Sequence, residues 1–242
     1  MLLKTRAIVL HTVRYAERSL VVTLYTEKSG RQTVILHGAR GAGARNKAAV
    51  IQPLYLLDTE SYVHKNREVQ LLKDVRLSHP YLTIPYDVSK SAQLLFLAEI
   101  LRKILQEEEA HPALFDFMES ALLFLDMMEQ GSSHFHLWFL VRLTGFLGIF
   151  PQESETGANR WFDMKKGTFV FSEPGHMGFM DRETTALLLK IMGLNINGLG
   201  TLKVSREQRN LLLDKILEYL HYHFGNLIPL KSLPVLKELF GG

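Results

Sequence analysis

The segment of residues 37–47, HGARGAGARNK, combines positive charge with small residues. Its cations are His37, Arg40, Arg45 and Lys47, and it contains no acidic residue that could neutralise them. Glycine and alanine let a backbone approach another chain closely, while cationic side chains pair with phosphates. The segment therefore predicts contact with a phosphate-bearing polymer. The alternative is a solvated basic loop without a function.

Motifs for enzymatic chemistry are incomplete in this sequence. Gly38 and Gly43 are spaced as in a nucleotide-binding P-loop, but Ala44 stands where the lysine is required. A dinucleotide fingerprint that begins at Gly41 would need a third glycine in place of Asn46. The sequence has no G-x-S-x-G or H-E-x-x-H motif, and its closest histidine pairs are two residues apart, a spacing that separates the rings on a helix. We therefore expect no enzymatic activity and no cofactor.

The 242-residue chain contains no cysteine. This excludes disulfides, thiolate nucleophiles, iron–sulfur clusters and Cys-ligated zinc. No apolar run approaches the ~20 residues that cross a bilayer, and the N-terminus lacks the pattern of a signal peptide. We expect a cytoplasmic protein without a membrane partner.

Positive charge is concentrated at the start of the chain. The whole sequence carries a formal net charge of +3, but residues 1–78 hold 13 Lys and Arg against 6 Asp and Glu. Such asymmetry suggests a basic module that meets a polyanion. The candidate nucleic-acid-binding residues are Lys4, Arg14, Arg31, His37, Arg40, Arg45, Lys47, Lys65 and Arg67, with Arg6 and Arg18 as further positive charge. Four tyrosines, Tyr15, Tyr25, Tyr55 and Tyr62, are candidates either for base stacking or for packing.

The first 78 residues follow the pattern of β-strands. Apolar residues alternate with period two through residues 3–77, and five short strands fit, with Gly30 in the turn between the second and third. We expect a small barrel or sandwich, for which the five-stranded OB barrel has a compatible size.

Beyond Pro80 the apolar period becomes 3.6, which predicts helices. We expect an OB-fold domain at 1–78, helices at 79–150, a small β-hairpin module at 151–180 and further helices at 181–242, an α+β chain overall. The helix near residues 135–147 is apolar on all sides and is expected to be central. Its one charge, Arg142, is a candidate anchor for an acidic partner tail, the alternative being an internal salt bridge.

The sequence resembles the RecO family of bacterial DNA repair and recombination mediators. The likeness lies in residues 6–10 and 15–17 of the first strand, residues 24–30 of the hairpin, HGAR at 37–40 and Gln52-Pro53-Leu54. It extends over most of the chain and weakens after about residue 150. The resemblance implies an N-terminal OB domain, a helical body, and binding and annealing of single-stranded DNA. It also implies partnership with RecR and docking of the acidic tail of the single-stranded-DNA-binding protein on the helical body.

One feature departs from the family pattern. Many members carry a four-cysteine zinc site where this chain has residues 151–180, and every cysteine is absent here. We expect no zinc, and we expect Trp161, Phe162, Phe169 and Phe171 to stabilise the hairpin by apolar burial instead.

Together, the residues and the resemblance predict a non-enzymatic mediator that binds and anneals single-stranded DNA. We expect it to associate with the nucleoid and to help load recombinase onto strands coated by single-stranded-DNA-binding protein. Two alternatives stay open: a protein-interaction scaffold whose basic barrel faces an acidic partner, and an OB protein that binds RNA.

Overall fold

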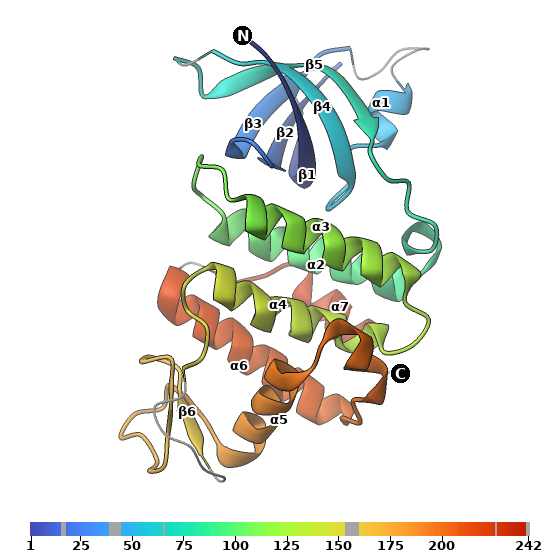
Figure 1. Ribbon diagram of the computed structural model, residues 1–242. Coiled ribbons are helices and arrows are strands. Elements are labelled where there is room, and N and C mark those ends of the chain that lie inside the picture. Colours follow the sequence, from blue (N-terminus) through green and yellow to red (C-terminus); the bar gives the residue numbers. More distant parts are fainter. Residues whose placement is uncertain (16–17, 39–44, 65, 153–159, 226, 241–242) are drawn as a thin grey trace. The chain divides into compact units, whose positions relative to one another are not determined.

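The computed structural model describes residues 1–15, 18–38, 45–64, 66–152, 160–225 and 227–240 (Figure 1). The chain divides into two compact units, Met1–Met127 and Met128–Gly242, which are treated separately below. The finer division at residues 78, 150 and 180 stays a prediction.

The first unit begins with a closed five-stranded barrel. Its strands are β1 (Leu2–Tyr15), β2 (Ser19–Thr26), β3 (Gly30–Leu36), β4 (Leu56–Tyr62) and β5 (Val69–Leu77). Around the barrel they follow the order β1-β2-β3-β5-β4, with β3 and β5 parallel and the other pairs antiparallel. The predicted five-stranded barrel of the OB type is confirmed.

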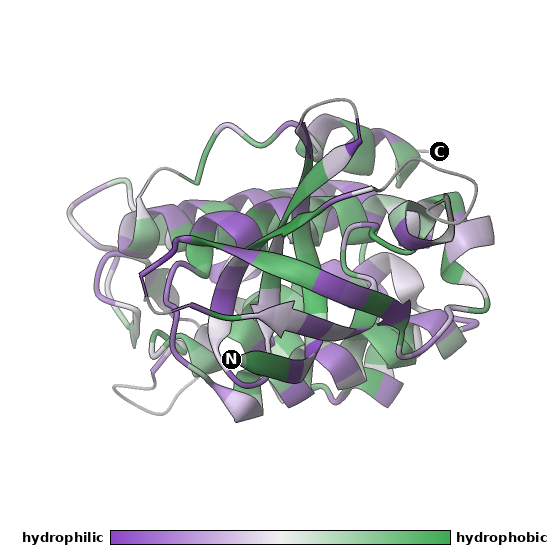
Figure 2. Cartoon of the chain, turned by 90° about the horizontal axis from the view of Figure 1, so that it is seen from above, coloured by the Kyte–Doolittle hydropathy of each residue, from purple (hydrophilic) through white to green (hydrophobic). Residues whose placement is uncertain are grey.

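Alternation of side chains along the strands fills the barrel. Val22, Leu24, Val34 and Leu57 point inward and are almost fully buried, so each strand contributes one apolar face to the core. Seen from above, the barrel strands carry both hydrophobic and hydrophilic segments (Figure 2). The turn between β2 and β3 requires glycine, because Gly30 has φ +59° and a Cβ there would lie 2.2 Å from the carbonyl oxygen of Glu109.

One expected strand is shorter than predicted. The apolar run from Val50 to Val63 fits the fourth of the five expected strands, but strand begins only at Leu56. The helix α1 (Arg45–Ala49) precedes the run, so residues 45–47 of the basic segment are helical. Leu54, in the connection to β4, adopts φ +57°. Its N–H donates to the carbonyl of Val9 (2.7 Å) and its carbonyl accepts from the Tyr81 hydroxyl (2.8 Å). These bonds hold a conformation that a non-glycine residue rarely adopts.

Two helices complete the first unit, α2 (Val88–Ile104) and α3 (Pro112–Met127). A short 3-10 turn at Ile84–Tyr86 leads into α2. Near the end of α3, the Asp126 carboxylate accepts hydrogen bonds from the backbone N–H groups of Leu82, Thr83 and Ile84 at 2.7–2.9 Å. Burial by itself would raise the pKa of Asp126, but these donors outweigh it and hold the pKa below its usual value. The carboxylate therefore fastens the segment between barrel and α2 to α3.

The second unit is built on helices. They are α4 (Phe135–Phe146), α5 (Arg182–Gly193), α6 (Arg206–Phe224) and α7 (Leu233–Leu239), with 3-10 turns at Ser132–His134 and Ile196–Thr201. Nearly every residue of α4 is buried, as its all-round apolar pattern predicted. The sequence Ser205-Arg206-Glu207-Gln208 has the spacing of a capping box, and Ser205 and Gln208 form one at the start of α6.

A three-stranded sheet lies between α4 and α5 in the sequence. It consists of β6 (Trp161–Asp163), β7 (Thr168–Val170) and β8 (Phe179–Met180), and Gly167 lies in the turn between β6 and β7 with φ +69°. Phe162 and Phe169 are fully buried and contact each other, but the expected burial of Phe171 is wrong, since it is 40% exposed at the edge of the sheet. Trp161 stacks beneath the guanidinium of Arg182, 3.9 Å from its ring centre.

Buried Asp163 organises the loops of this sheet. Its Oδ1 accepts from the N–H groups of Lys165 and Lys166, and its Oδ2 lies 3.3 Å from Nε2 of His176. Within the described residues no group of three or more His, Asp or Glu is arranged to hold a metal. Among the described helices, none has the length and apolar character needed to span a membrane.

Candidate nucleic-acid interface

A groove opens at one end of the barrel, within the first unit. It has a volume of about 410 Å³ and lies between the ends of β1 and β2 and the α1 segment. Its walls are formed by His11, Thr12, Arg14, Arg18, Ser19, Leu20, Ala48, Ile51, Gln52 and Pro53. None of these described lining residues is acidic. The groove is therefore a positively charged, partly apolar surface.

Arg14 and Arg18 supply the charge of the groove. Arg14 is the penultimate residue of β1, where its register partner on β2 is Leu20, and Arg18 directly precedes β2. Both side chains are exposed, and neither forms an ion pair with any described residue. Unpaired guanidinium groups on a concave surface can bind phosphate oxygens with two parallel hydrogen bonds.

Two histidines border this region. His37 follows β3, is exposed, and its Nδ1 lies 3.0 Å from the Ser19 hydroxyl at the start of β2. For His11, burial and the positive charge of Arg102 lower the pKa below its usual value. His11 is therefore neutral at pH 7 and adds no positive charge to the groove.

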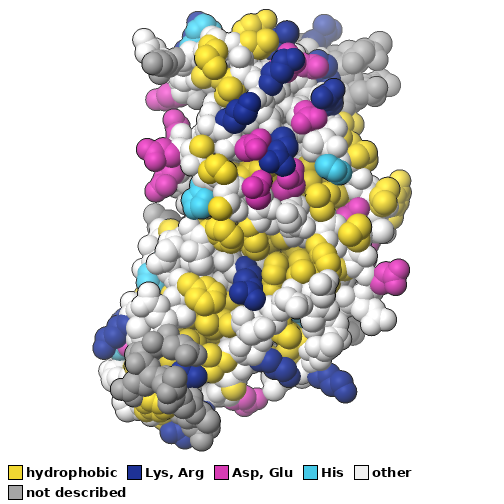
Figure 3. All heavy atoms as spheres, viewed as in Figure 1, with side chains coloured by type: hydrophobic (Ala, Val, Ile, Leu, Met, Phe, Trp, Pro, Cys, Tyr) yellow, Lys and Arg dark blue, Asp and Glu magenta, His cyan; other side chains and the backbone are white. Residues whose placement is uncertain are grey.

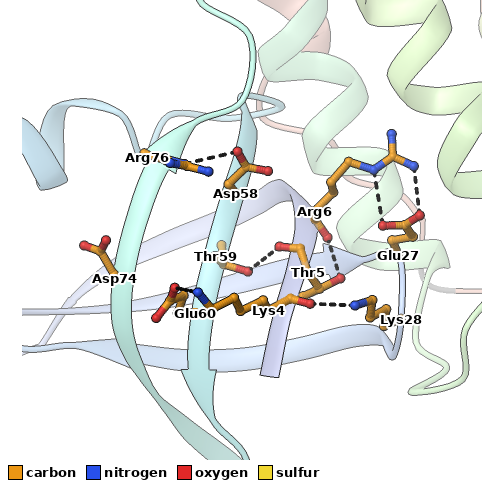
Figure 4. A pocket seen from close by; sticks show the side chains of 10 residues that line it. All are labelled: Lys4, Thr5, Arg6, Glu27, Lys28, Asp58, Thr59, Glu60, Asp74 and Arg76. Atoms are coloured by element: carbon orange, nitrogen blue, oxygen red, sulfur yellow. Dashed lines mark hydrogen bonds and ion pairs between the residues drawn. The ribbon is translucent and has the colours of Figure 1, made fainter. Parts of the chain in front are cut away.

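A second depression, of about 350 Å³, lies over β1, β4 and β5, and its cations are paired with acids. Figure 4 shows Lys4 directed at Glu60, with 2.5 Å between nitrogen and oxygen, and Arg76 directed at Asp58, at 3.2 Å. Lys73 also pairs with Glu60. The Lys4 ammonium, followed by that of Lys73, lowers the pKa of Glu60, so the carboxylate stays ionised.

The same face continues with Lys47, which belongs to the predicted set. Its ammonium lies 2.5 Å from Asp74 and lowers the pKa of that carboxyl group. Basic and acidic side chains accordingly lie next to one another on the barrel in Figure 3.

Arg6 and Arg31 hold parts of the first unit together. The Arg6 guanidinium pairs with Glu27 at 2.9 Å, with Asp116 at 3.2 Å and with Glu119, and the hydrogen bond to Glu27 is the main reason that its pKa is raised. Arg31 donates to the carbonyl oxygens of Arg102 and Leu105 at the end of α2, both at 2.8 Å. These two arginines are occupied by internal partners.

Of the remaining predicted cations, Arg67 is the one whose side chain is described. Arg67 is exposed in the β4–β5 connection and lines a smaller depression together with Glu68 and Glu108. Arg40 and Lys65 lie outside the described residues. Arg45 begins α1, but its side chain also lies outside them.

The four candidate tyrosines separate into two kinds. Tyr15 and Tyr62 are 59% and 40% exposed, at the ends of β1 and β4. Tyr25 is buried, which raises its pKa to about 12, and Tyr55 packs edge-on against Tyr81 with ring centres 5.2 Å apart. Only the first two have rings accessible to a base.

In the second unit, Arg142 contacts the end of α5. Its Nη2 donates to the carbonyl of Leu194 (2.7 Å), which also accepts from the indole N–H of Trp138 (3.1 Å). The guanidinium lies 6.0 Å from the centre of the Trp138 ring. Arg142 is half-buried and forms no ion pair with a described residue, so the alternative of an internal salt bridge is not realised there.

Comparison with known proteins decides the family. The model of the Recombination protein O N-terminal domain matches residues 1–81, and that of the C-terminal domain matches residues 85–234. The chain is 36% identical over 241 residues to DNA repair protein RecO of Bacteroides fragilis, with 99% of this chain and 100% of that protein covered. The chain belongs to the RecO family. DNA repair proteins RecO of Phocaeicola vulgatus and Flavobacterium psychrophilum are 34% and 35% identical, again over 99% of this chain and 100% of each relative.

Membership of the RecO family makes this chain a DNA repair protein. Within that barrel, the structure places Arg14 and His37 beside the groove, whereas Lys4, Arg31 and Lys47 have internal partners. The candidate set predicted from the sequence does not include Arg18. Its position between two predicted strands could have identified it, because a side chain in a connection at the end of a barrel has no strand beside it to supply a partner.

Proposed function

We propose that this RecO-family chain is a non-enzymatic mediator of recombinational DNA repair. It binds single-stranded DNA in the groove at the end of the barrel, anneals complementary strands, and helps to load recombinase onto strands coated by single-stranded-DNA-binding protein. The pair Arg14 and Arg18 supports this proposal most directly. Both guanidinium groups are exposed and pair with no carboxylate of a described residue, and the described lining of the groove contains no acid. Family membership supplies the context of DNA repair.

Charge neutralisation explains how such a surface assists annealing. Two DNA strands repel each other through their phosphates, and cations that occupy some of those phosphates reduce the repulsion. The bases then meet at a lower energetic cost, and no nucleotide hydrolysis is needed. His37 and the segment that follows it, with Arg40 and Arg45, are proposed to continue the phosphate path, together with Lys65 and Arg67 on the β4–β5 connection.

Lys4, Arg31 and Lys47 contribute less in this proposal. A phosphate would have to displace Glu60 from Lys4 and Asp74 from Lys47, and Arg31 would have to give up two backbone carbonyls. Each displacement costs free energy, whereas phosphate binding to an arginine without an internal partner does not require it.

The proposed partners follow the same logic of charge. Arg142 is the candidate anchor for the acidic tail of single-stranded-DNA-binding protein, since no carboxylate of a described residue neutralises it. RecR is proposed as the second protein partner. The protein is proposed to act in the cytoplasm, at the nucleoid. Competition by a tail peptide, lost in Arg142→Ala, tests the anchor.

The decisive experiment measures annealing of complementary strands coated by their binding protein, with and without this chain.

The salt dependence of single-strand binding tests the groove itself. Each phosphate contact adds ~0.7 to the magnitude of the log–log salt slope, so Arg14→Ala/Arg18→Ala should lower it by about 1.4. The affinity of this variant at 0.1 M salt should fall by about 20-fold. Lys4→Ala/Arg76→Ala is the matched control, because it removes two positive charges from the paired face. An equal loss in both variants, or a loss in neither, would remove the groove from the binding site.

A further inference from the structure

One buried arginine of the second unit forms no ion pair with a described residue. Arg209 lies near the start of α6 and is only 9% exposed. Its Nη2 donates to the carbonyl oxygen of Phe240, the residue that follows α7, at 2.6 Å. Its Nε is buried and has no hydrogen-bond partner within the part of the chain that the structure describes. Burying a cation without a counter-ion costs free energy, so Arg209 marks a candidate site for an anion.

The two nitrogens of Arg209 define the kind of anion. Nε and Nη2 of a guanidinium lie side by side and donate in parallel, which matches the two oxygens of one carboxylate. The carbonyl of Phe240 offers one neutral oxygen, so it satisfies only one of the two donors. A carboxylate would satisfy both donors and neutralise the guanidinium.

Two neutral imidazoles border the guanidinium. Burial, followed by the charge of Arg209, lowers the pKa of His134 and that of His136, which falls to about 3. Both rings are therefore neutral at pH 7, and Arg209 supplies the positive charge of the site. A single positive charge matches a carboxylate better than a phosphate monoester, which carries about two negative charges. Nδ1 of His134 is buried and has no hydrogen-bond partner among the described residues, so it is a second polar atom available to a ligand.

Phe240 shows what else the site accepts. Its ring stacks on the imidazole of His136, with ring centres 5.6 Å apart and planes inclined by 22°. The guanidinium carbon of Arg209 lies 5.4 Å from the centre of the same ring. The site therefore holds an aromatic ring next to an oxygen that accepts a hydrogen bond.

The segment that carries Phe240 has few buried contacts. α7 has seven residues, and Leu236 is its buried side chain, whereas Leu239 is 38% exposed. The ion pair of Lys237 with Asp214 on α6 is partly exposed, and such pairs add little stability. A short helix with few buried side chains opens more readily than the unit on which it packs. α7 and Phe240 can therefore leave the site while the other helices stay folded.

We propose that Phe240 is an autoinhibitory plug: it covers a binding site for a peptide carboxylate that lies beside an aromatic ring, and it competes with that ligand for Arg209. The inference goes beyond the proposed function, which assigns no role to Arg209 or α7. With α7 closed, Arg209 holds the neutral carbonyl of Phe240. With α7 open, Nε and Nη2 hold the carboxylate. Binding is weaker than the open site allows, because only molecules with α7 open can take the ligand.

A small ligand that resembles Phe240 provides the test. Binding of N-acetylphenylalanine, which has a free carboxylate, and of its neutral amide is measured by NMR titration. The proteins are wild type, Phe240→Ala and the control Leu239→Ala, which shortens an apolar side chain of the same segment. Phe240→Ala should bind the acid at least about tenfold more tightly than the wild type and the control do. It should prefer the acid to the amide by about tenfold, because a hydrogen bond between charged groups is the stronger one.

A double variant tests whether the guanidinium causes the preference. Phe240→Ala/Arg209→Gln keeps the site uncovered and removes its charge, so it should bind acid and amide equally. In the wild type, saturation with the acid should speed hydrogen exchange of the α7 amides, because the ligand displaces α7.

Equal affinity of Phe240→Ala for acid and amide would overturn the inference, as would a preference that survives in the double variant. Equal affinity of wild type and Phe240→Ala for the acid, or unchanged exchange of α7, would show that Phe240 does not compete with the ligand. These measurements use no DNA, so their failure is distinct from failure of the proposed function.

Discussion

Two faces of the same barrel hold their cations in different ways. Over β1, β4 and β5, Lys4 and Arg76 sit opposite acids, because Lys4 is the register partner of Glu60 and Arg76 that of Asp58. At the end of the barrel, the register partner of Arg14 is Leu20. The residue across the strand, rather than the number of cations, therefore decides whether a cation on this barrel has a carboxylate partner.

The paired face contributes to the stability of the first unit, and Arg6 should show this most strongly. Arg6→Ala leaves Glu27, Asp116 and the poorly exposed Glu119 as three neighbouring carboxylates without their cation. Breaking a buried pair costs ~3–5 kcal/mol, and partial exposure reduces this to roughly 2.5 kcal/mol. Native-state hydrogen exchange of the β1 amides measures the loss. The exposed pair of Arg76 is the control, and equal loss in Arg76→Ala would contradict the ranking.

In the second unit, burial keeps the basic side chain of His136 neutral. Burial lowers its pKa from 6.5 to about 3, so the folded state resists protonation that the unfolded chain accepts. Stability is therefore complete above pH 6.5 and falls as the pH drops from 6.5 towards 3, by about 2 kcal/mol at pH 5.

Tryptophan fluorescence measures this loss, because Trp138 and Trp161 both lie in the second unit. His136→Gln should have a flatter dependence on pH than the wild type. A wild-type protein equally stable at pH 7 and pH 5 would show that His136 is not held neutral.

Removing the acids from the paired face should leave its cations without partners, as the groove leaves Arg14 and Arg18. Asp58→Asn/Glu60→Gln leaves Lys4, Lys73 and Arg76 without carboxylates, so single-strand affinity at low salt should rise by about fivefold and the salt slope should steepen. Replacing Glu129 and Glu173 by Gln makes the same change in net charge without releasing a partner of the barrel cations. A similar rise in both variants would mean that total charge alone governs binding.

Local patterns in the sequence were sufficient for much of the fold. The turn at Gly30, the capping box at Ser205 and the apolar helix around Val141 each depend on neighbours within a few residues. The pairing of Lys4 with Glu60 depends on the register of strands 56 positions apart, which no local pattern encodes. For the same reason, the sequence could not separate Lys4 and Lys47 from Arg14.

The short helix α1 shows a second limit. Small residues before it suggested a loop, and five residues are too few to display a helical period. The apolar character of Phe171 predicts that it is buried, but its position at the edge of a three-stranded sheet leaves it partly exposed.

The carboxylate of Asp126 limits where this chain can be divided without losing a contact. The two family models meet between residues 81 and 85, at the segment whose N–H groups Asp126 binds from the end of α3. A barrel transplanted between relatives at that boundary would be separated from the aspartate that fastens it. A piece that keeps these hydrogen bonds ends after α3, so a chimaera that moves barrel, α2 and α3 together is expected to retain them.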